Sequence, residues 1–193
     1  MLRLGAVLRV WLLFPLLLAA CGFVRAQQAD TLEIGVLPNL SSRILFSHYQ
    51  PMREYLERVL MRPVQVSTAP DWQSFYSRAR KGEYAITITA AHLARLHQLE
   101  SGHIPLVLFT PGIKALLVVD KDKPISKIGD LRGTTLALSN PKSLVTLQGM
   151  QWLAEQGLRR GENLRTLNTP TDDSVGNLVL NGDCVAALIS GGE

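Results

Sequence analysis

Small and polar residues follow several predicted strands of this chain, where they could hold a small polar ligand. In open α/β sheets, ligands bind outside the carboxyl ends of the strands, where helix N-termini present free backbone N–H groups. Five segments fit this description, three in the first half of the chain and two in the second. They are residues 38–42 (PNLSS), 69–72 (APDW), 87–91 (TITAA), 139–143 (SNPKS) and 169–173 (TPTDD).

Each segment also has an ordinary structural interpretation. Ser143 and Asp172 could simply cap helices, and Thr89 could be a hydroxyl at the end of a strand. Trp72 could pack in the core beneath its own sheet, and Lys142 could be a solvated surface lysine. The shared position of the segments in the α/β pattern, rather than any single residue, favours a ligand site.

Catalytic patterns are weak in this sequence. The histidines His48, His92, His97 and His103 show no metal-ligand spacing with cysteine or carboxylate partners. Ser190 has no Gly-x-Ser-x-Gly context, and neither a Walker A pattern nor Gly-x-Gly-x-x-Gly occurs. The sequence therefore predicts a binding protein that is not an enzyme, with no metal and no cofactor.

The elements that position these segments alternate along the chain. Apolar runs predict strands at residues 32–37, 64–66, 84–89, 104–109, 113–119, 134–138, 164–167 and 185–189. Amphipathic stretches predict helices at residues 43–60 (restarting at Pro51), 72–80 (capped by Asp71), 90–99, 143–156 and 172–180. Strands that alternate with helices indicate an α/β fold with mostly parallel sheets. Two strands follow one another across residues 110–112, and this indicates a passage between lobe 1 (residues 27–112) and a partial lobe 2 (residues 113–193).

An export signal is expected at residues 1–26. Arg3 and Arg9 precede an apolar run at residues 10–20, which is shorter than the roughly 20 apolar residues that span a bilayer. Leu18-Ala19-Ala20-Cys21 resembles a bacterial lipobox, in which Cys21 is lipidated; cleavage after Ala26 would instead release a soluble protein. A third alternative is a signal that stays uncleaved as an anchor. All three place the folded part outside the cytoplasm, in the periplasm, and in the first case it is a membrane-anchored lipoprotein.

Net charge and cysteine content exclude some classes of protein. The formal net charge of +4 falls to +1 without the signal. Three arginines are removed with it, and the remaining chain has 17 basic and 16 acidic residues. No basic block is present, so nucleic acid is not an expected partner. Cys184 lies in an apolar run and is expected to be a small buried hydrophobe.

The chain resembles the phosphate/phosphite/phosphonate-type periplasmic substrate-binding proteins of ABC transporters. The resemblance rests on the order and spacing of loose motifs: LEIGVLP at 32–38, YQPMREYL at 49–56, APDW at 69–72, KGEYA at 81–85, IGDLRG at 128–133, NPKS at 140–143 and NGDCVAA at 181–187. It implies a two-lobed type II periplasmic-binding fold with flanking helices. It also implies a small-molecule ligand held between the lobes and an ABC permease as partner. The candidate ligand-binding residues are then Ser41, Trp72, Thr89, Ala90, Ser143, Leu144 and Asp172.

Departures from the family pattern bear on the ligand. Thr89 stands where the family typically has a tyrosine, and Asp172 where it has a histidine; residues 143–146 (SLVT) replace a Ser-Thr-Ser-Gly loop. A carboxylate would repel an anionic ligand by about 1 to 4 kcal/mol per unit charge at ~4 Å, so a less charged or cationic solute is expected. Family members also continue for roughly a hundred residues more, which implies a truncated second lobe. A sensory domain feeding a histidine kinase, or more distantly an enzyme on the same fold, is the alternative function.

Overall fold

The computed structural model describes residues 31–110 and 112–191. The predicted export signal and Cys21 lie outside these residues. Within the described part of the chain, no helix is both long enough and apolar enough to cross a membrane. Two separate sheets form, one of three strands and one of four.

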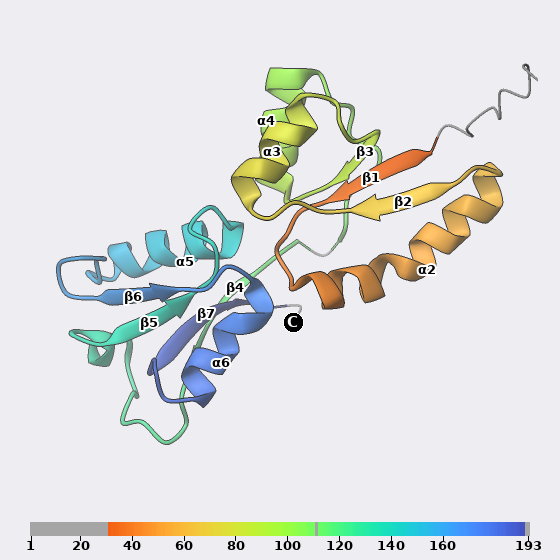
Figure 1. The fold of residues 1–193 in the computed structure, drawn as a ribbon. Coiled ribbons are helices and arrows are strands. Elements are labelled where there is room, and N and C mark those ends of the chain that lie inside the picture. Colours follow the sequence, from red (N-terminus) through yellow and green to blue (C-terminus); the bar gives the residue numbers. More distant parts are fainter. Residues whose placement is uncertain (1–30, 111, 192–193) are drawn as a thin grey trace, which may run out of the picture. The chain divides into compact units, whose positions relative to one another are not determined.

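The first sheet is fully parallel. Strand β1 (Leu32–Val36) lies between β2 (Val64–Ser67) and β3 (Ile86–Ile88). Helices α2 (Ser42–Leu60), α3 (Trp72–Arg80) and α4 (Ala91–Ser101) make the connections. Figure 1 shows α2 on one side of this sheet and α3 and α4 on the other. The strands are therefore covered on both faces, as parallel sheets require.

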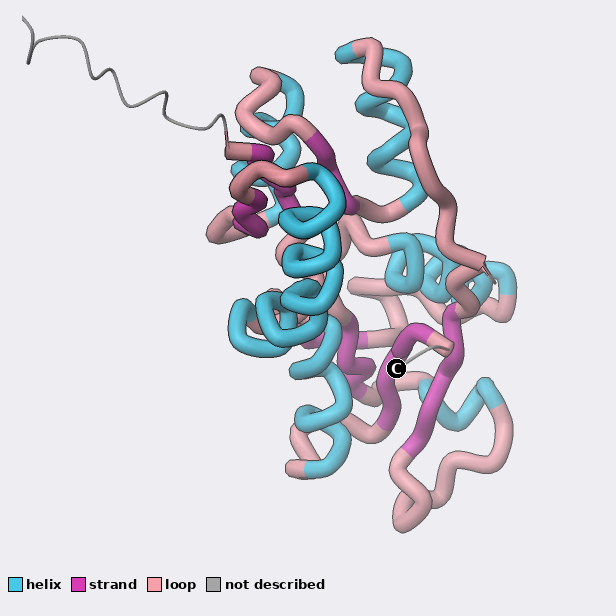
Figure 2. The backbone as a smooth tube through the Cα atoms, turned by 90° about the vertical axis from the view of Figure 1, so that its right-hand side faces the viewer, coloured by secondary structure: helices cyan, strands magenta, loops and turns pink. Residues whose placement is uncertain are grey.

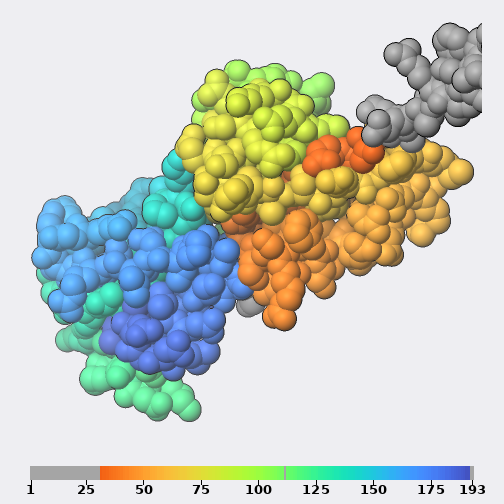
Figure 3. All heavy atoms as spheres, viewed as in Figure 1, coloured from red at the N-terminus to blue at the C-terminus, as the bar shows by residue number. Residues whose placement is uncertain are grey.

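Alternating side chains of β1 and the neighbouring residues divide between two apolar clusters. Leu32 and Ile34 face α2 and pack with Val64. Leu37 packs on the opposite side, with Trp72 and other residues of α3 and α4. In the space-filling view, β1 (orange-red) shows only as a small patch between α3 and β2 (Figure 3). Successive side chains of a strand point to opposite faces of the sheet, which fixes the face that each side chain reaches.

The second sheet has the order β4-β7-β5-β6. Its strands are β4 (Ala115–Val119), β5 (Thr135–Leu138), β6 (Arg165–Asn168) and β7 (Ala186–Ser190). Strand β4 runs antiparallel to β7, and the other pairs are parallel. Helix α5 (Leu144–Glu155) packs on one face through Leu136 and Leu188, whereas α6 (Val175–Leu180) packs on the other through Ala137 and Ala187.

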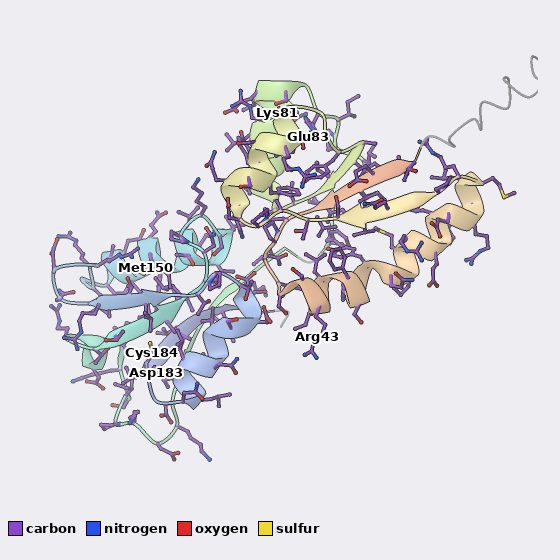
Figure 4. All side chains as sticks on the ribbon, viewed as in Figure 1. Arg43, Lys81, Glu83, Met150, Asp183 and Cys184 are labelled. Carbon is purple, nitrogen blue, oxygen red and sulfur yellow. The ribbon has the colours of Figure 1, made fainter. Side chains whose placement is uncertain are left out.

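Two further features of the second sheet are structural. The 3-10 helix η2 (Ile128–Leu131) is held by Asp130, whose Oδ2 accepts hydrogen bonds from the N–H groups of Ser126 (3.0 Å) and Lys127 (3.1 Å). Cys184 is buried beside α6, and its N–H donates to the carbonyl of Leu178 at 2.9 Å (Figure 4). The expectation that Cys184 is a small buried hydrophobe is confirmed.

Three sequence-based expectations were wrong in detail. Residues 104–109 form no strand but an extended loop between α4 and β4 (Figure 2). Their apolar side chains are 72–83% exposed, because no described strand lies beside them to pair with their backbone. Helix α2 runs through Pro51 without a restart; Pro51 and Ser47, whose carbonyl it frees, both face solvent. The expected helix at 172–180 begins with a separate 3-10 turn, η3 (Asp172–Ser174).

Candidate functional site

A cluster of buried hydroxyl groups follows the carboxyl end of β5. The Oγ of Ser139 lies 2.9 Å from the Oγ of Ser143 and 3.4 Å from the Oγ1 of Thr146. Ser143 also caps α5, since its Oγ accepts the backbone N–H of Thr146 at 3.1 Å. All three residues are at most 4% exposed. Ser143 thus has the ordinary capping role, and it combines that role with membership of a polar cluster.

Asp172 opens η3 directly beyond β6 and does not act as a helix cap, a position held by Thr171. Asp172 lines a narrow depression with Ser139, Val145, Val175 and the end of β7, and this depression has no room for a water molecule. The Oδ2 atom accepts a long hydrogen bond of 3.4 Å from the Nδ2 of Asn39. Burial raises the pKa of the Asp172 carboxyl above its ordinary value, against the opposing hydrogen bonds of Ser139 and Asn39.

Asp173 joins the two sheets. Its Oδ1 accepts the backbone N–H of Ser41 at 3.0 Å, at the N-cap position of α2. The adjacent N–H of Asp172 donates to the carbonyl of Asn39 at 2.7 Å. Burial raises the pKa of the Asp173 carboxyl, but the hydrogen bonds from Thr171 and Ser41 together lower it by more than burial raises it. The pKa therefore lies below its ordinary value. A carboxylate distant in sequence therefore caps a helix that has no side-chain cap of its own.

A second link between the sheets lies at the start of α4. The Nε2 of His92 lies 2.9 Å from the carbonyl oxygen of Lys142. The Nζ of Lys142 in turn donates to the Oε1 of Gln73 at 2.8 Å. Sequence reasoning missed His92 as a site residue. The signal that could have found it is its place in the first turn of a helix that follows a strand end.

Thr89 and Ala90 precede this helix. Ala90 holds the N-cap position of α4 in an extended conformation (φ −66°, ψ 145°), and no side chain caps the helix there. The Oγ1 of Thr89 is buried and has no hydrogen-bond partner among the described residues; the same holds for the Nδ1 of His92. Unpaired N–H groups and buried polar atoms at one helix start are groups that a ligand could satisfy.

Trp72 lies in the core of the first sheet. It is 5% exposed, packs in the cluster of Phe75 and Tyr84, and donates its Nε1–H to the carbonyl of Pro38 at 3.1 Å. This hydrogen bond holds the segment after β1 in place. Leu144, the other apolar candidate, is the first residue of α5 and is half-buried. The predicted ligand contacts of these two residues stay predictions.

The arrangement provides hydrogen-bond donors and acceptors together. Hydroxyl groups and the first turns of α4 and α5 offer donors, whereas Asp172 offers acceptors. Among the described residues, no group of three or more His, Cys, Asp or Glu could hold a metal ion. The chemistry that this set can perform is the recognition of a small polar solute.

The sequence profile of one protein family matches residues 34–192. Its description is periplasmic substrate-binding protein of a phosphonate ABC transporter. The chain belongs to this family. The resemblance expected from the loose motifs is thereby confirmed.

Solved structures of substrate-binding proteins share the fold. A binding protein component of an ABC phosphonate transporter from Pseudomonas aeruginosa has a TM-score of 0.72 and 18% identity over 85% of this chain. A protein from Prochlorococcus marinus (MIT 9301) in complex with methylphosphonate has a TM-score of 0.68 and 15% identity over 83% of this chain. A protein from Xanthomonas citri bound to ATP has a TM-score of 0.59 and 24% identity over 84% of this chain. These likenesses confirm the type II periplasmic-binding fold that the sequence predicts.

The chain spans 58%, 63% and 65% of the lengths of these three structures. The family is described as periplasmic and as part of phosphonate transport. Two of these structures name a bound ligand, methylphosphonate and ATP, and these ligands belong to those proteins. Family membership alone therefore leaves the ligand of this chain to be argued from its own residues.

Proposed function

We propose that this chain is the extracytoplasmic solute-binding component of an ABC import system and that it binds a small polar or anionic ligand. The observation that supports this most directly concerns two sets of polar groups, the buried hydroxyl cluster of Ser139, Ser143 and Thr146 and the uncapped start of α4. The hydrogen bond between His92 of α4 and Lys142, beside Ser143, connects the two. Two such donor sets suit a solute with several oxygen acceptors.

The ligand would lie between the two sheets. Two hydrogen bonds connect the helices of the first sheet with residues of the second. Ser41 donates its N–H to the carboxylate of Asp173, and His92 is hydrogen-bonded to the carbonyl of Lys142. Closure around a ligand would strengthen or replace these contacts, which is the usual behaviour of hinged binding proteins. A permease in the inner membrane would receive the closed complex, and Cys21 would carry a lipid anchor if the lipobox is used.

A binding screen tests the proposal. Alkylphosphonates, sulfonates, inorganic oxyanions and amines would be added to the purified chain, and thermal shift and calorimetry would measure binding. The expected result is saturable binding of at least one class with a raised melting temperature. Failure of every class to bind, or turnover of a bound compound, would refute the proposal.

One variant connects binding to the site. Thr89→Val removes the unpartnered buried hydroxyl and keeps the shape of the side chain. We expect roughly tenfold weaker binding, because a ligand hydrogen bond is lost, with no loss of stability. Thr135→Val is the matched control, since Thr135 begins β5 at the end opposite the hydroxyl cluster. It should leave affinity unchanged.

A further inference from the structure

The carboxylate of Asp172 has fewer hydrogen-bond donors than it can accept. An ionised carboxylate offers about four acceptor positions. The structure supplies Asn39 at 3.4 Å and the hydroxyl of Ser139. That hydroxyl is shared with Ser143 and Thr146 in the buried cluster. The charge is therefore partly buried and incompletely satisfied.

No cation in the described part of the chain compensates the charge of Asp172. Among the described residues, no lysine or arginine lies within ion-pair distance of Asp172, and the charge that acts on it is that of Asp173. A partly buried charge without a partner is unfavourable unless another group supplies a donor. The depression that Asp172 lines has no room for a water molecule. A ligand donor would therefore reach the carboxylate by replacing the long hydrogen bond from Asn39.

The neighbouring carboxylate of Asp173 differs from that of Asp172 in its hydrogen bonds and its position. The Asp173 carboxylate accepts the N–H of Ser41 and a hydrogen bond from Thr171, and it does not line the depression. The two adjacent carboxyl groups have pKa values displaced in opposite directions, upward for Asp172 because of burial and downward for Asp173 because its hydrogen bonds outweigh burial. The carboxylate of Asp173 is therefore hydrogen-bonded within the fold, whereas that of Asp172 keeps acceptor positions for a ligand.

We propose that Asp172 determines the specificity of the ligand site by accepting a hydrogen bond from the ligand. The ligand therefore presents a donor at this point, either an ammonium group or an acidic hydroxyl such as P–OH, and fully deprotonated dianions are rejected. This inference rests on the proposed function, because it assigns the ligand class of the same site. It departs from the sequence resemblance, which implies a histidine at this position in phosphonate binders.

Two pairs of probes separate the two donor sources in calorimetric titrations of the purified chain. The ammonium pair is 2-aminoethanesulfonate and its near-isostere propane-1-sulfonate, which lacks the cationic group. The hydroxyl pair is methylphosphonate below and above its second ionisation, with methanesulfonate at both pH values as the probe that carries no P–OH. In at least one pair the donor-bearing member should bind at least roughly tenfold more tightly, because its donor interacts with the charged carboxylate of Asp172.

Variants assign the preference to one side chain. Asp172→Asn removes the charge and adds a donor, so the preference should disappear and methylphosphonate dianion should bind at least roughly tenfold more tightly than to the original chain. Asp172→Ser should also abolish the preference, and it provides a second test if one variant folds poorly. Asp173→Asn is the matched control, and it should keep the preference even where it lowers stability.

The outcomes are distinct. Equal binding of both members in each pair, or a preference that survives in Asp172→Asn and Asp172→Ser, would overturn the assignment of Asp172 while leaving a solute-binding function in place. Absence of binding by all probes to the original chain and to every variant would overturn the proposed function together with the inference.

Discussion

Removal of the Asp173 carboxylate should destabilise the protein because it uncaps α2 from a distance. Asp173 accepts the N–H of Ser41 at 3.0 Å, and α2 has neither a side-chain cap nor an acidic residue in its first turn. Loss of a helix cap costs about 0.5–2 kcal/mol, and a hydrogen bond to a charged group is worth about 1.5–3 kcal/mol. Asp173→Ala should therefore lower the free energy of unfolding by about 1–2 kcal/mol, which corresponds to a melting temperature lower by roughly 2–8 °C.

The pH dependence of this effect follows from the lowered pKa of Asp173. A carboxyl whose folded-state pKa is depressed stabilises the fold above its unfolded value of about 3.9, and the stabilisation is lost as the pH falls through the folded-state pKa. The difference between Asp173→Ala and the original chain should thus be largest near neutral pH and vanish in strong acid. Asp173→Asn keeps an acceptor oxygen and should lose about half as much.

Thermal melts across pH and hydrogen exchange at the start of α2 are the measurements. The comparison variant is Asp71→Ala, which removes the local cap of α3, where the Asp71 Oδ1 accepts the N–H of Ser74 at 2.8 Å. It should lower the melting temperature similarly without faster exchange at Ser41. A melting temperature unchanged to within about 1 °C, together with unchanged exchange at Ser41, would refute the capping argument.

Two further predictions concern the first sheet. His97 is 1% exposed and stacked on Tyr76, and its ring nitrogens have no hydrogen-bond partner among the described residues. Burial lowers the pKa of His97, so stability should fall as the pH drops below about 6.5, and urea titrations of His97→Phe should show less of this loss. A Cβ at Gly35 would overlap the ring of Tyr84, so Gly35→Ala should lower the free energy of unfolding by about 1–3 kcal/mol. Gly176 in α6 has open space around it, so Gly176→Ala should raise the free energy of unfolding by about 0.5–1 kcal/mol in the same titration.

The elements were largely predictable because their signals are local. Asp71 before an amphipathic stretch predicted the cap of α3, and the apolar runs predicted β1, β5 and β7 within one or two residues. Residues 104–109 show the limit of such reasoning. An apolar run predicts a strand only when a neighbour supplies hydrogen bonds, and that information is not local.

The site was less predictable than the fold. The segments predicted from the sequence do lie at strand ends and helix starts, but Trp72 lies in the core and His92 was missed. That these segments bind a ligand stays a prediction. The hydrogen bond that Ser41 donates to Asp173 joins residues 132 positions apart. No sequence pattern specifies such a pair without the folded backbone that brings them together.

The uncovered run at residues 104–109 has a practical consequence for handling this protein. Five large apolar side chains stand in water there: Ile104, Leu106, Val107, Leu108 and Phe109. An extended, uncharged stretch of this kind invites edge-to-edge aggregation. Light scattering of concentrated samples should therefore rise with time, and a lysine in place of Val107 should slow that rise.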